Sequence, residues 1–193
     1  MSRLRRGLRS ELTGLQQSLE VARSAGQDAD RFRELTARIC GSRNNAMGIR
    51  AELRVASNVP GLTAVGLKVP GAPDCSGTGR VDIDVVCHGG ACWIEVKSVA
   101  ELGPSSSAWQ GNPGHVKGLR VQLQAAMHAA QMERNFVRYA PPRVVLVVAE
   151  SLPGDLREEI EAMGVHVAVG FSPALPTVRA ACACPWLAPV TCS

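Results

Sequence analysis

The chain has 193 residues, of which 46% are apolar and 20% charged, so it can bury a core and wholesale disorder is excluded. A net charge of +4 permits nucleic-acid binding without requiring it. No run of about 18 apolar residues occurs, so we expect no membrane span. Seven cysteines without a secretory signal indicate an intracellular protein of the cytoplasm or nucleus, although the Arg- and Ser-rich start leaves an organelle presequence open.

The N-terminal segment, residues 1–42, is predicted to be a helical hairpin arm. Its leucines recur at steps of three and four, which is the period of a helix, and Ala25-Gly26 divides the pattern in two. Arginines cover the outer face of both halves. This face is either a solvated helical surface or an arm that binds a protein partner or nucleic acid.

Residues 43–170 are predicted to form one α/β domain, and residues 171–193 an irregular tail rich in Pro and Cys or the start of a further domain. The predicted order is α-β-β-β-α-β with an extra α-β, and the final strand–helix–strand segment predicts a parallel pair in a mixed sheet. The predicted elements are helix 45–56, strands 62–69, 81–87 and 91–99, helix 116–137, strand 143–149, helix 154–163 and strand 164–169.

The strands 81–87 and 91–99 are predicted to pair as a hairpin around Gly89-Gly90. In that register Asp84 lies opposite Glu95 and Asp82 opposite Lys97, and residues that pair point to the same face. The opposite face, expected to belong to the core, carries Val81, Ile83, Val85, Ile94 and Val96.

Carboxylates that face each other across a strand pair repel, so the hairpin needs a compensating charge. A divalent cation supplies it, and Mg²⁺ (or Mn²⁺) often binds through one or two carboxylates and several waters. Lys97 could then orient an attacking water or stabilise developing negative charge on a phosphoryl group. The alternative is a solvent-exposed strand face on which an Asp and a Lys form an ordinary cross-strand pair.

The segment 79–99, GRVDIDVVCHGGACWIEVKSV, resembles the core motif of the PD-(D/E)xK nuclease superfamily. The resemblance implies a restriction-endonuclease-like α-β-β-β-α-β core with a mixed sheet. It also implies that Asp84, or failing that Asp82, binds the metal together with Glu95, and that Lys97 is the catalytic lysine.

The same resemblance suggests accessory residues. Glu52, on the first core helix, is placed to join the metal site, and Gln122 and Gln124 are candidates to face it from the helix that follows the third strand. The alternative for Glu52 is an ordinary exposed glutamate on a helix, and Gln122 and Gln124 could equally be solvated. The implied function is that of a Mg²⁺-dependent phosphodiesterase (a nuclease), or a degenerate nuclease-like domain, that acts on DNA or RNA.

A second resemblance covers more of the chain. VDIDVVCHGG, Trp109-Gln110-Gly111, the helix near Gln122 and the segment RVVLVVAESLPGDLREEIEAMGVHV are similar to the N-terminal region of an uncharacterised eukaryotic protein family. In that family the region precedes a further C-terminal domain. This resemblance implies the alternative function, a non-catalytic protein-interaction module that keeps the nuclease-like fold.

Overall fold

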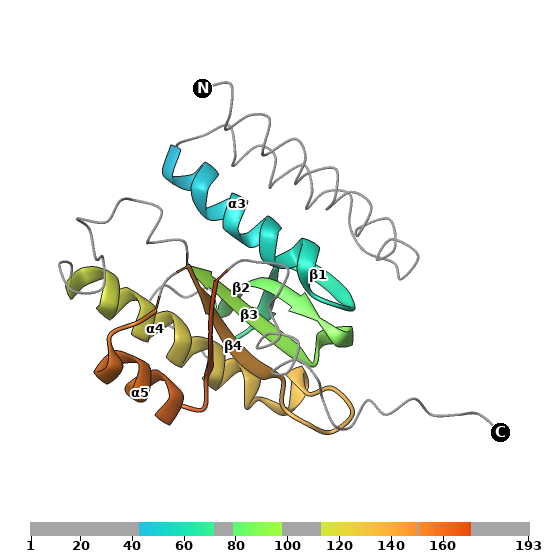
Figure 1. Ribbon diagram of the computed structural model, residues 1–193. Helices are drawn as coiled ribbons and strands as arrows, with labels where there is room; N and C mark the ends of the chain where they lie inside the picture. Colours follow the sequence, from blue (N-terminus) through green and yellow to red (C-terminus); the bar gives the residue numbers. More distant parts are fainter. Residues whose placement is uncertain (1–42, 72–78, 98–112, 150, 171–193) are drawn as a thin grey trace.

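The computed structural model of the chain describes residues 43–71, 79–97, 113–149 and 151–170 (Figure 1). Within them lie three α-helices and five strands, in the order of elements predicted for this part of the chain. The protein is therefore an α/β protein with a five-stranded mixed sheet. The predicted arm (1–42) and tail (171–193) lie outside the described residues, and no described helix has the length and apolarity needed to cross a membrane.

The sheet has the strand order β1-β2-β3-β4-β5. β1 pairs with β2 and β2 with β3 in antiparallel fashion, whereas β3–β4 and β4–β5 are parallel. Parallel neighbours need a long crossover, and each parallel pair here has a helix between its strands, as predicted for the last one. The elements are α3 (Arg43–Asn58), β1 (Leu62–Pro70), β2 (Arg80–Cys87), β3 (Cys92–Lys97), α4 (Pro113–Ala130), β4 (Arg143–Val148), α5 (Gly154–Ala162) and β5 (His166–Val169).

Helices cover both faces of the sheet, with α3 on one face and α4 and α5 on the other (Figure 1). Val85, Ile94 and Val145 belong to the core on the α3 side, and Trp93 and Leu146 to the core on the α4 side. In β4 every residue after the first is buried, as expected for a strand covered on both sides. The site-bearing strand β3 lies next to β4, at the middle of the sheet.

The β2–β3 hairpin has the predicted register in its paired part, which ends at Val85–Ile94, before the predicted pairs Asp84–Glu95 and Asp82–Lys97. Cys87 pairs with Cys92, and the Ala91 N–H donates to the His88 carbonyl at 3.3 Å, which closes a turn around Gly89-Gly90. Both glycines have positive φ, which a tight hairpin turn requires and which side chains with a Cβ disfavour. The pairing continues through Val86–Trp93 and Val85–Ile94.

The alternation of side chains breaks in β2. Val85 packs in the α3-side core, whereas Ile83, two residues earlier, packs in the α4-side core. The register places Gly66 of β1 opposite Asp84, and Gly66 has a φ of +62°. β1 changes faces at the same level, since Val65 packs on the α3 side and Leu67 on the α4 side of the sheet, and the conformation of Gly66 between them is one that glycine adopts without steric cost.

The prediction of one apolar hairpin face is therefore wrong. Two of its five residues, Val81 and Ile83, pack against the α4-side core, and the other three belong to the α3-side core. The prediction depends on strict alternation along the whole of β2, and the change of face between Ile83 and Val85 breaks that alternation.

The predicted helix 116–137 is also too long, because α4 ends at Ala130. The Asn135 side-chain amide donates to the Ala129 carbonyl at 2.8 Å, and the Met132 N–H donates to the same oxygen at 3.1 Å, so the chain closes back on the last turn of the helix. A short 3₁₀ turn, η3 (Glu133–Asn135), follows in place of the last helical turns.

Candidate active site

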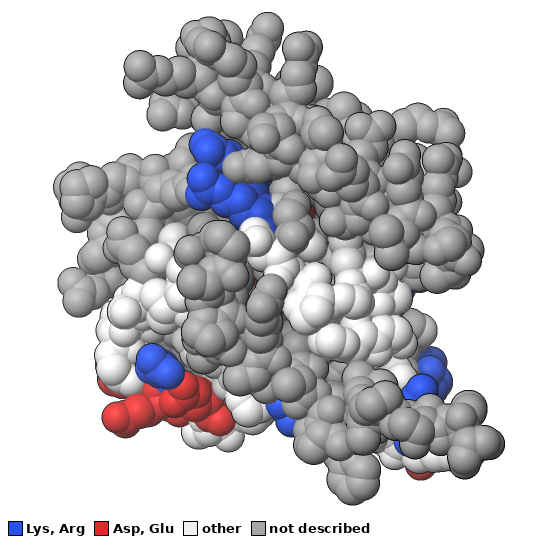
Figure 2. Space-filling view, turned by 45° about the vertical axis from the view of Figure 1, so that its right-hand side comes forward, with Lys and Arg blue, Asp and Glu red and all other residues white. Residues whose placement is uncertain are grey.

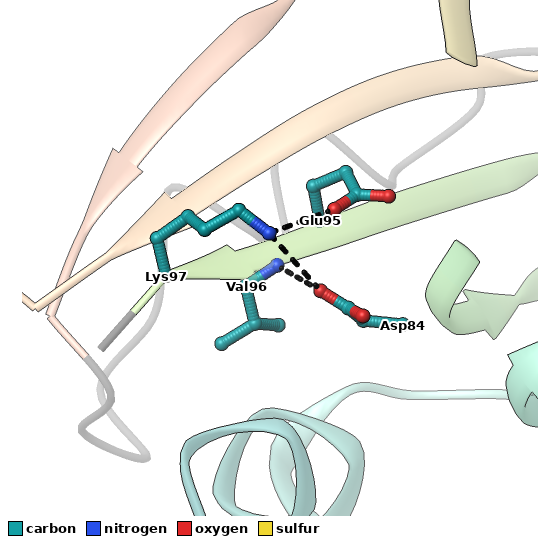
Figure 3. A network of polar contacts seen from close by, with 4 residues as sticks. All are labelled: Asp84, Glu95, Val96 and Lys97. Atoms are coloured by element: carbon teal, nitrogen blue, oxygen red, sulfur yellow. Dashed lines mark hydrogen bonds and ion pairs between the residues drawn. The ribbon is translucent and has the colours of Figure 1, made fainter. Parts of the chain in front are cut away.

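Asp84 of β2 lies beside Val96 of β3 at the point where the hairpin pairing ends. The backbone pairs run from Cys87–Cys92 to Val85–Ile94. At the next step the Asp84 Oδ2 atom accepts a hydrogen bond of 2.8 Å from the Val96 N–H (Figure 3). A side-chain carboxylate thus takes the place of a strand carbonyl, and this fixes the Asp84 oxygens against the backbone of β3.

Lys97 joins the two carboxylates that the hairpin brings together. Its Nζ atom lies 3.2 Å from Glu95 Oε2 and 3.9 Å from Asp84 Oδ2 (Figure 3). Glu95 is only 4% exposed. The side chains of Lys97 and Asp84 are 22% and 21% exposed, so the three ionisable groups lie at the boundary between core and solvent. We call Asp84, Glu95 and Lys97 the acidic–lysine triad.

The pKa of Glu95 is raised to about 8, chiefly because burial disfavours the charged carboxylate and secondly because of the negative charge of Asp84. The ammonium group of Lys97 opposes this rise. Burial alone would lower the pKa of Lys97, but the carboxylates of Asp84 and Glu95 more than compensate, so its pKa is raised. At neutral pH the Glu95 carboxyl therefore holds a proton beside a charged lysine.

Glu52 is the accessory residue whose charge reaches the triad. It lies on α3, is 7% exposed, and its negative charge contributes to the raised pKa of Lys97. Asp82 has a different environment, because it is exposed and pairs across the sheet with Lys68 of β1. The structure thus separates the two candidate aspartates and brings Asp84, rather than Asp82, to Lys97.

The two glutamines lie on the outer side of α4. Gln122 and Gln124 are both exposed, whereas the buried residues of the helix turn toward the sheet. These buried residues are Leu119, Leu123, Ala126, Ala129 and Ala130.

The donor chemistry of the triad fits Mg²⁺ or Mn²⁺, since hard cations bind carboxylate oxygens and Mg²⁺ often uses only two of them. The geometry is less complete. Among the described residues, no group of three or more His, Cys, Asp or Glu side chains is arranged to hold a metal ion. The charge compensation predicted for a cation is supplied by Lys97, which contacts Glu95 directly.

Two features of the site escaped the sequence pattern. The first is the hydrogen bond from the Val96 N–H, which selects Asp84 as the residue fixed on β3. The second is the left-handed Gly66 opposite it. A lone glycine within a predicted strand was the available signal, because such glycines often mark a bend or a close backbone approach.

Comparisons with known proteins add no relative. No protein-family model, no curated protein and no solved structure matches the chain. Any statement about function therefore rests on the residues and geometry of the triad and on the order of elements around it.

Proposed function

We propose that the described domain is a PD-(D/E)xK-type nuclease domain with a restriction-endonuclease-like core, acting as a Mg²⁺-dependent phosphodiesterase on nucleic acid. The observation that carries the proposal is the triad itself: an Asp from β2 and a Glu-x-Lys from β3 meet around one ammonium group. The α-β-β-β-α-β order of α3 through β4 supports the same class.

Asp84 and Glu95 are the residues that would hold the cation, and Glu52 is the nearest further acid whose charge acts on the triad. The metal, when bound, supplies an activated water and charge stabilisation at a phosphoryl oxygen. Lys97 would point its ammonium group at the charge that develops on the phosphate. The hydrogen bond from the Val96 N–H would keep Asp84 in place when a cation is bound.

Cation binding at this site requires Glu95 to lose its proton. Because its pKa is about 8, binding at neutral pH would release a proton and would tighten as the pH rises to 8 and above. An ordinary surface carboxylate pair would release no proton at pH 7, since it is already ionised. Proton release on cation binding at pH 7 therefore distinguishes the proposed site from an ordinary pair of surface carboxylates.

The test is calorimetric titration of the full chain with Mg²⁺ and Mn²⁺. Asp84→Asn retains an oxygen that accepts from the Val96 N–H, so it removes the ligand charge with little damage to the fold. Glu95→Gln removes the second ligand charge at nearly constant volume. Asp82→Asn is the matched control, because Asp82 is exposed and pairs with Lys68.

We expect wild type and Asp82→Asn to bind the cation, and Asp84→Asn and Glu95→Gln to lose at least tenfold in affinity while they stay folded. Cleavage of labelled DNA and RNA by wild type would then be measured with the same variants. Absence of cation binding by wild type at pH 9, with a short oligonucleotide present, would overturn the proposal.

A second candidate is a non-catalytic interaction module on the same scaffold. Two observations favour it: within the described residues a third metal ligand is absent from the triad, and Lys97 already balances the carboxylates. The titration distinguishes the two candidates, because an interaction module has no need of a cation at Glu95.

A further inference from the structure

A two-residue turn between α4 and β4 has a strained backbone. Arg138 and Tyr139 have φ values of +51° and +69°, and the flanking residues Val137 and Ala140 exchange two backbone hydrogen bonds of 2.9 and 3.1 Å. Positive φ at both central residues defines a type I′ turn, whose preferred residues are Asn and Gly. Arg and Tyr carry a Cβ that this conformation disfavours, so neither residue serves the turn itself.

The turn is held from several sides. The Arg134 guanidinium donates to the Gly71 carbonyl at 3.1 Å, and the Asn135 amide donates to the Pro70 carbonyl at 2.8 Å, which fixes the preceding segment on the end of β1. Val137 packs close to the β2–β3 turn, since a Cβ added to Gly90 would lie 3.3 Å from it. Strain that is held in place in this way is typical of binding and active sites.

The turn presents an aromatic ring and a cation to solvent. Tyr139 is 99% exposed, and Arg138 beside it is exposed as well. The connection projects at the lower right of Figure 1, and segment 131–143 contains three arginines and one acidic residue. On the face shown in Figure 2 most of the visible acidic side chains gather at the lower left, where a basic side chain lies beside them, and further basic side chains lie near the top and at the lower right.

This chemistry favours a nucleic acid over a protein as the partner. The other large apolar side chains exposed among the described residues are Val121 on α4 and Val169 on β5, so Tyr139 is not part of an apolar patch on one element. Protein interfaces are built around buried apolar clusters. A single exposed ring beside guanidinium groups instead suits a base that stacks and a phosphate that pairs with arginine.

We propose that the Arg138–Tyr139 turn binds single-stranded nucleic acid, with the tyrosine ring stacked on an unpaired base and the Arg138 guanidinium on a neighbouring phosphate. The inference rests on the proposed function and deepens it, because it names an unpaired strand as the substrate class. Arg143, just after the turn, pairs with Cys92 at the start of β3, and Lys97 lies about 17 Å further along that strand. The turn is thus a positioning contact, remote from the triad.

The test is fluorescence anisotropy of the full chain with labelled oligo(dT) and oligo(U) of about 12 nucleotides, in EDTA so that nothing is cleaved. Tyr139→Gly should weaken binding about 5- to 150-fold, the range of one lost stacking contact. Arg138→Gly should weaken binding and reduce the dependence of log affinity on log salt by about one phosphate contact. Tyr139→Phe keeps the ring and should bind as wild type, as should Val121→Ala, an exposed apolar control on α4.

A second readout separates binding from structure. Both glycine variants relieve a disfavoured φ, so each should raise the melting temperature by roughly 2–4 °C while it weakens binding. A turn with only a structural role would show the gain in stability without the loss in affinity. That result, or tighter binding of a duplex than of either single strand, overturns this inference and leaves the metal-binding test of the triad unaffected. If wild type binds no nucleic acid at low salt, the proposed function falls with it.

Discussion

Lys97 stands between two carboxylates that the hairpin would otherwise hold in mutual repulsion. Its ammonium group lies 3.2 Å from Glu95 and 3.9 Å from Asp84, and these contacts raise its own pKa against the effect of burial. The pKa of Glu95 is raised as well, because burial outweighs the effect of the ammonium group and keeps the carboxyl protonated at neutral pH. At the scale of single residues, the site is thus a charge balance that a change in pH or in one side chain disturbs.

The raised pKa of Glu95 links stability to pH. Its folded pKa of about 8 lies above the unfolded value of 4.5, so its contribution is fully present below pH 4.5 and is lost as pH rises through 8. Within this window we expect Glu95 to lower the free energy of unfolding by up to about 1.4 kcal/mol per pH unit. Urea denaturation of wild type and Glu95→Gln at pH 5, 7 and 9 measures the free energy of unfolding at each pH. If this free energy changed with pH equally in the two proteins, the prediction would be contradicted.

Removal of the lysine should be costly. Lys97→Met leaves Asp84 and Glu95 without their cation, and we expect a loss of about 2–3 kcal/mol in the free energy of unfolding, below the usual cost for a fully buried pair because Lys97 is 22% exposed. The pKa of Glu95 should rise further, since Lys97 lowers it. Adding Glu95→Gln to Lys97→Met should recover part of the loss, and strict additivity of the two changes would argue against a direct interaction.

At the scale of elements, the β1–β2 pair is the part of the sheet that depends on one residue. Gly66, which has a left-handed φ, lies opposite Asp84 in the β1–β2 register, at the point where the side chains of β2 change faces. We expect Gly66→Ala to lower the free energy of unfolding by about 1–2 kcal/mol, because an added Cβ disfavours this conformation. Gly118→Ala is the control, since Gly118 lies in α4 with open space around its Cβ position and should stabilise by about 0.5–1 kcal/mol. A Gly66→Ala variant as stable as wild type would contradict this reading.

The elements were predictable where the chain repeats a regular pattern. The continuous apolar run of β4 predicts a buried strand, and the spacing of apolar residues in α4 predicts a helix. The pair Gly89-Gly90 predicts the turn of the hairpin and so its register. The end of α4 was not predictable, because it depends on the Asn135 amide reaching back to Ala129. The hydrogen bond that fixes Asp84 on β3 was not predictable either, because its donor is the Val96 backbone N–H, which a side-chain pattern does not describe.

At the scale of the whole molecule, two layers of helix hold β3 and β4 in the centre. Leu146 of β4 is fully buried in the α4-side core and lies beside Glu95 in the parallel register. We expect Leu146→Ala to lower the free energy of unfolding by about 3–4 kcal/mol through lost burial and a cavity. Val121→Ala, on the exposed face of α4, should change it by less than about 0.5 kcal/mol. If denaturant titrations gave similar losses in the free energy of unfolding for the two variants, Leu146 would not lie in the core.

The fold places the site at the boundary of core and solvent. There the Glu95 carboxyl is buried enough to keep its proton at neutral pH, and it is close enough to solvent to exchange that proton for a cation. The most direct measurement is the number of protons released when Mn²⁺ binds at pH 7, obtained by calorimetry in two buffers with different heats of ionisation. We expect wild type to release close to one proton for each Mn²⁺ bound, because Glu95 has a pKa of about 8. We expect Glu95→Gln to release none. Binding without proton release, or binding that Glu95→Gln leaves intact, would contradict the assignment of the acidic–lysine triad as the metal site.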